Sequence, residues 1–157
     1  MVGQWRHLPA PARPIAEAGD RAVAAARDHD REAFDAAAAS LGGLDPAQVG
    51  LLLGTVVRLA MEDLHPDGLD GDDARAVLTG VVREAAGWQP DVDPYVFLVV
   101  LAGALGMHDT SDDAPVPKPE ALARHAALLC AYLLDRRPFP PYLDRAAQEI
   151  ERTQLND

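Results

Sequence analysis

The sequence predicts an all-α protein, a single-domain bundle of about seven helices around a central apolar helix at residues 94–108. The 157 residues include 29 Ala and 20 Leu but only 2 Ile and 4 Thr, so helix-forming residues dominate. Within most segments, apolar residues are spaced three and four positions apart, as on one face of a helix. The length suits one domain spanning residues 1–157 without disulfide bonds.

The N-terminal part predicts an extended arm followed by two helices. Prolines interrupt residues 1–13, which we expect to form the arm. Pro14 suits the first turn of a helix, and an alanine-rich stripe continues from it to about residue 28. Asp30 is placed to cap a second helix, which Gly42-Gly43 would stop.

Two segments combine an aspartate cap with a proline at the first helical position, Asp45-Pro46 and Asp93-Pro94. The helix after Asp93 contains an uninterrupted apolar run, and a helix that is apolar all round is normally surrounded by its neighbours. We therefore place this helix at the centre of the bundle. Glycines inside helices cost stability relative to alanine, so close helix crossings are expected at Gly50, Gly54, Gly80, Gly103 and Gly106.

The remaining helices begin at clear signals. Aspartates at residues 70–73 open a helix that ends at Gly87. Pro119 begins a helix with leucines on its inner face, and Phe139-Pro140-Pro141 opens the last helix.

The charge balance argues against several classes of partner. Asp and Glu outnumber Lys and Arg by 25 to 14, which gives a formal net charge of -11. This excess repels phosphate, so we expect neither nucleic acid nor a membrane surface as a partner. Because the chain has one cysteine and its N-terminus lacks the apolar run of a signal peptide, we expect a cytoplasmic protein.

The sequence offers little catalytic chemistry. Neither Ser40 nor Ser111 lies in a nucleophile motif. Cys130 and His125 fall on the apolar face of their helix, where packing roles are expected. We predict no catalytic residue and no cofactor, and the chain fits a non-enzymatic protein better than an enzyme.

The richest polar region combines imidazoles with carboxylates. If the two apolar helices run in antiparallel hairpins, His65, Asp67, His108 and Asp109 can lie at one pole of the bundle. These side chains suit a divalent cation and form a candidate metal site. The interpretation that we favour is that the aspartates at 70–73 only cap a helix and interact with its dipole.

The leading hypothesis is a non-catalytic, acidic helical module for interaction or regulation. We expect it to bind a protein partner and to form a homodimer, with the final helices, 120–136 and 142–153, as the first candidates for the interface. The alternative is a small-molecule or divalent-cation-binding protein, or a metal-dependent enzyme, that uses the His/Asp-rich pole.

Overall fold

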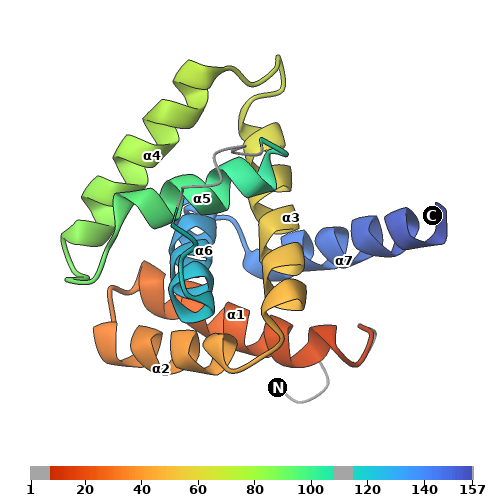
Figure 1. Cartoon of the computed structure of the whole chain (residues 1–157), viewed down its shortest axis with the longest axis horizontal. Coiled ribbons are helices and arrows are strands. Elements are labelled where there is room, and N and C mark those ends of the chain that lie inside the picture. The colour runs from red at the N-terminus through yellow and green to blue at the C-terminus, as the bar shows by residue number, and fades with distance from the viewer. Residues whose placement is uncertain (1–7, 108–114, 157) are drawn as a thin grey trace.

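The computed structural model describes residues 8–107 and 115–156, and within these ranges it contains helices and no strands (Figure 1). The all-α prediction is thereby confirmed. The helices of the described ranges are, in chain order, α1 (Ala12–Arg27), α2 (Arg31–Gly42), α3 (Pro46–Leu64), α4 (Gly71–Ala86), α5 (Pro94–Ala104), α6 (Pro119–Leu134) and α7 (Phe139–Asn156).

Aspartate side chains start four of these helices, as the sequence predicts. Each carboxylate accepts a hydrogen bond of 2.9 to 3.1 Å from a backbone N–H of the first turn. Those N–H groups have no partner inside the helix, so the caps determine where each helix begins. The capping residues are Asp30, Asp45, Asp70 and Asp93.

Helix α6 lies at the centre of the bundle. It packs against α1, α2, α3, α4 and α5, and Figure 1 shows it between these elements. Its buried residues occupy nearly all sides of its C-terminal half, and they belong to a hydrophobic core to which α1 to α7 all contribute. One shared core agrees with the single predicted domain.

The apolar helix that we expected at the centre, residues 94–108, lies instead at the side of the bundle. Helix α5 ends at Ala104, because Gly106 adopts a φ of 75° and the Met107 N–H reaches back to the Ala102 carbonyl over 2.8 Å. This arrangement is a Schellman motif, which terminates a helix. Few of the side chains of α5 are buried, and Leu98 is 47% exposed. No helix within the described ranges has the length and apolarity needed to cross a bilayer.

The predicted close crossings hold at one of the five glycines. A Cβ built on Gly80 would overlap the hydroxyl of Tyr132, so α6 approaches α4 closely there. Gly106 lies just beyond the end of α5 and serves its termination. The other three helical glycines, Gly50, Gly54 and Gly103, have nothing within 4 Å of an added Cβ, so the expectation is wrong for them.

The first helix begins two residues earlier than predicted. Helix α1 begins at Ala12 rather than at Pro14, and the Arg13 side chain donates a 2.9 Å hydrogen bond to the Leu8 carbonyl. Leu8 is buried and belongs to the core. Residues 1–7 of the predicted arm lie outside the described residues.

Candidate functional site

His65 joins the end of α3 to the start of α4. Its Nδ1 lies 2.9 Å from the Met61 carbonyl oxygen, one turn back in α3. Its Nε2 lies 3.7 Å from a carboxylate oxygen of Asp73, in the first turn of α4. The imidazole is therefore placed between two helix ends, with one contact to each.

The aspartates at the start of α4 form a capping box. The Asp70 carboxylate accepts a hydrogen bond from the Asp73 N–H at 2.9 Å, and the Asp73 carboxylate accepts one from the Asp70 N–H at 3.1 Å. Each side chain thus satisfies a backbone group of the other residue. The structure confirms the capping role that the sequence predicts for Asp70 and Asp73.

The predicted metal site is described only in part. His65 and Asp67 lie in the described ranges, whereas His108 and Asp109 lie outside them. Within residues 8–107 and 115–156 there is no group of three or more histidine, cysteine, aspartate or glutamate side chains that could hold a metal ion. The four-residue site remains a prediction.

His125 and Cys130 have the packing roles expected of them. The His125 Nε2 accepts a 3.0 Å hydrogen bond from the Asp93 N–H, so Nδ1 carries the proton and donates to the Ala121 carbonyl at 2.8 Å. Burial lowers the pKa of His125 below its usual 6.5. Burial raises the pKa of the Cys130 thiol to about 12, which leaves it unreactive as a nucleophile.

A polar cluster that the sequence did not predict ties α3 to α7. One Asp63 carboxylate oxygen accepts hydrogen bonds from the Tyr142 hydroxyl at 2.7 Å and from Arg145 at 2.8 Å. These hydrogen bonds, with that of Arg145 first, lower the pKa of Asp63. No local pattern could have revealed the cluster, since its members lie about eighty residues apart and meet only through tertiary packing.

Helices α3 and α5 together form an apolar face. We call it the α3–α5 face. It contains an open groove of about 420 Å³. Leu51 on α3 lies in its wall and is 44% exposed. The lining residues are Gly50, Leu51, Gly54, Thr55, Arg58, Val99, Val100, Gly103, Ala104 and Ala126.

The α3–α5 face is nearly free of charge. Arg58 is the one charged residue in its lining. Its guanidinium group pairs with Glu62 on α3 at 3.1 Å and with Glu149 on α7 at 3.4 Å, so acidic neighbours offset its charge. The sequence did contain a signal for this face: Gly50 and Gly54 are one helical turn apart, and both therefore open the same side of α3.

Comparisons with known proteins give no relative: no family model, no curated protein and no solved structure matches the chain.

Proposed function

We propose that the chain is a non-catalytic helical interaction module that forms a homodimer through the α3–α5 face. The observation that carries this proposal is the position of α5. Residues 94–107 contain no charged side chain, yet Val99, Val100 and Ala104 of α5 line an open groove rather than the closed core. An apolar helix is normally covered, and exposed apolar patches mark interaction sites.

A second copy of the chain fits this face because the face contains both a projection and a recess. The Leu51 side chain projects into the groove region, and the space above Gly50, Gly54 and Gly103 is open. A two-fold axis through the groove would bring the Leu51 of each copy toward the glycines of the other. Two-fold dimers are the commonest oligomers, and their interfaces are self-complementary in this way.

Charge also favours self-association at this face over the remaining surface. Each copy has a formal net charge of -11, so two copies repel one another where carboxylates face each other. The lining of the α3–α5 face has no carboxylate. Contact there removes apolar surface from water without bringing acidic side chains into the centre of the interface.

Light scattering over micromolar to millimolar concentrations tests the proposal, because the monomer mass is 16.8 kDa. The Leu51→Glu variant should raise the dimer dissociation constant by at least about tenfold, since burial of one leucine contributes roughly 1.5–3 kcal/mol. Leu69→Glu is the matched control: Leu69 is 37% exposed and lies outside the groove. This control should dimerise like the unchanged chain.

A second variant fills the recess without disturbing the monomer. A Cβ on Gly54 meets nothing within 4 Å, so the Gly54→Leu variant should fold normally and fail to dimerise. A monomer mass at every concentration would overturn the proposal. Equal weakening by Leu51→Glu and Leu69→Glu would also overturn it, since the contact would then not depend on this face.

A further inference from the structure

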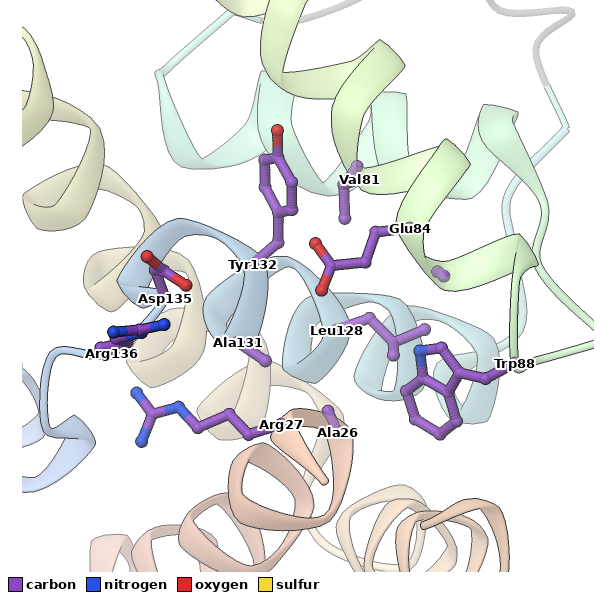
Figure 2. A pocket seen from close by; sticks show the side chains of 11 residues that line it. Ala26, Arg27, Val81, Glu84, Trp88, Leu128, Ala131, Tyr132, Asp135 and Arg136 are labelled. Carbon is purple, nitrogen blue, oxygen red and sulfur yellow. The ribbon is translucent and has the colours of Figure 1, made fainter. Parts of the chain in front are cut away.

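A cleft of about 430 Å³ lies between the C-terminal end of α1, the side of α4 and the C-terminal half of α6 (Figure 2). Its volume falls within the range of roughly 300–1,000 Å³ typical of small-molecule sites. The lining combines apolar, aromatic and charged side chains of both signs: Ala26, Arg27, Val81, Glu84, Ala85, Trp88, Leu128, Ala131, Tyr132, Asp135 and Arg136.

One end of the cleft is an apolar wall built around Trp88. The His29 ring stacks on the indole with a centroid separation of 5.3 Å and an interplanar angle of 9°. Phe34 meets the indole edge-on at 5.4 Å. These contacts hold Trp88 in place, and Leu128 on α6 lies beside it in the lining (Figure 2). The wall can receive an apolar group of a ligand.

The opposite end of the cleft carries two arginines. Figure 2 shows the guanidinium groups of Arg27 and Arg136 at the end away from Trp88. Arg27 donates a hydrogen bond to the Arg137 carbonyl, which fixes its orientation. Two guanidinium groups that meet at one end of a cavity suit a carboxylate, because each offers several N–H donors.

A carboxylate projects between these two ends. Figure 2 shows the Glu84 side chain extending from α4 into the middle of the cleft. One of its carboxylate oxygens lies 3.8 Å from Nε2 of His29, the ring that stacks on Trp88. The Asp135 carboxylate also lies at the arginine end, where the two arginines outnumber it (Figure 2). The order of net charge along the cleft is therefore positive, negative and apolar.

The backbone at the arginine end is strained. Asp135, which follows α6, has a φ of 52° although it is not glycine. Such conformations cost free energy and cluster at functional sites. The turn brings Asp135 and Arg136 to the edge of the cleft.

We propose that this cleft binds a small zwitterion of the amino-acid type with an apolar side group. The ligand's carboxylate lies between Arg27 and Arg136, its ammonium group meets Glu84, and its side group packs against Trp88. The order of charges along the cleft matches that of such a molecule, whereas a simple anion would face Glu84 and a simple cation would face the arginines. The cleft shares no lining residue with the α3–α5 face, so this inference does not depend on self-association.

Three related probes test the ligand class. L-phenylalanine carries both charges, 3-phenylpropionate lacks the ammonium group, and phenethylamine lacks the carboxylate. In a full-length Trp5→Phe variant, Trp88 is the one tryptophan left, so its indole resonance in an NMR titration reports binding at the cleft. L-phenylalanine should shift this resonance saturably, and each truncated probe should bind at least about tenfold more weakly.

Variants of the lining assign the contacts. Glu84→Gln should weaken the binding of L-phenylalanine by at least about tenfold and leave the binding of 3-phenylpropionate unchanged or tighter. Arg136→Gln should weaken the binding of both ligands. The control is Glu17→Gln, since Glu17 is exposed and lies outside the cleft, and it should weaken the binding of neither. The proposal is overturned if L-phenylalanine fails to bind up to about 10 mM. It is equally overturned if the three probes bind alike or if Glu84→Gln has no effect.

Discussion

The buried His125 predicts how stability depends on pH. Its side chain is 2% exposed, both ring nitrogens are used by backbone groups, and its ring meets Phe97 edge-on at 4.7 Å. Burial lowers its pKa most strongly, and Arg124 lowers it further, while the Ala121 hydrogen bond and Asp93 act in the opposite direction. Protonation of Nε2 would also remove the acceptor for the Asp93 N–H.

The sign and size of the effect follow from proton linkage. Since the folded pKa lies below the unfolded value of 6.5, the unfolded chain binds more protons in this range. The stabilisation that neutral His125 contributes is therefore complete above pH 6.5. It declines as the pH falls below 6.5, until His125 in the folded chain also takes up a proton. If His125 stays neutral in the fold, the free energy of unfolding falls by at most about 1.4 kcal/mol between pH 7.5 and pH 5.5.

Urea denaturation of two variants separates titration from hydrogen bonding. His125→Phe leaves the Asp93 N–H without its acceptor, so it should lose about 1–3 kcal/mol at pH 7.5. It cannot titrate, and its stability curve should therefore approach that of the unchanged chain as the pH falls. His125→Gln supplies a neutral amide and should show the same flatter curve. Asp35 and Asp63, whose pKa values lie below 3.8, act outside this window. Parallel curves for all three proteins would refute the reasoning.

Three further predictions follow from individual contacts. Gly80→Ala should destabilise the chain because the added methyl group overlaps Tyr132. In a Tyr132→Ala background the same change should stabilise the chain by about 0.5–1 kcal/mol, as denaturation of the single and double variants would show. A gain in both backgrounds would contradict the close approach. Cys130 should resist iodoacetamide in the folded protein, because its thiol is buried with a pKa of about 12, and labelling as fast as in urea would exclude this environment. Mn²⁺, Zn²⁺, Mg²⁺ or Ca²⁺ should not raise the melting temperature; a saturable rise abolished by His65→Ala or His108→Ala would instead establish the metal site.

Local signals in the sequence were sufficient to place the starts of the four helices that aspartates cap. An aspartate cap such as Asp45 acts within its own first turn, so the sequence contains both partners of the interaction. The same locality explains why Asp70 and Asp73 could be interpreted as caps before the structure was known. The end of α5 carried a local signal too, Gly106, which the prediction of a helix to residue 108 did not use.

Packing could not be predicted in the same way. Composition made residues 94–108 the expected centre, but α6 occupies it, although α6 carries Arg124 and His125. Burial of α6 is possible because backbone groups satisfy the His125 ring and Arg124 pairs with Asp35 over 2.8 Å at the edge of the core. Asp93 and Asp35 are distant in sequence from α6, so the apolar run alone misjudged which helix the others surround.

The two ends of α5 bear on the entropy cost of the proposed dimer. At its start, the N–H of the capping residue Asp93 is held by His125, and at its end Gly106 and Met107 close the helix. Both termini are thus fixed by contacts within one chain, and Phe97 anchors the inner side in the core. A dimer formed on the outer side would require no new helix and little ordering of the backbone. Association would then lose less entropy than coupled folding does, so even a modest apolar face can support it.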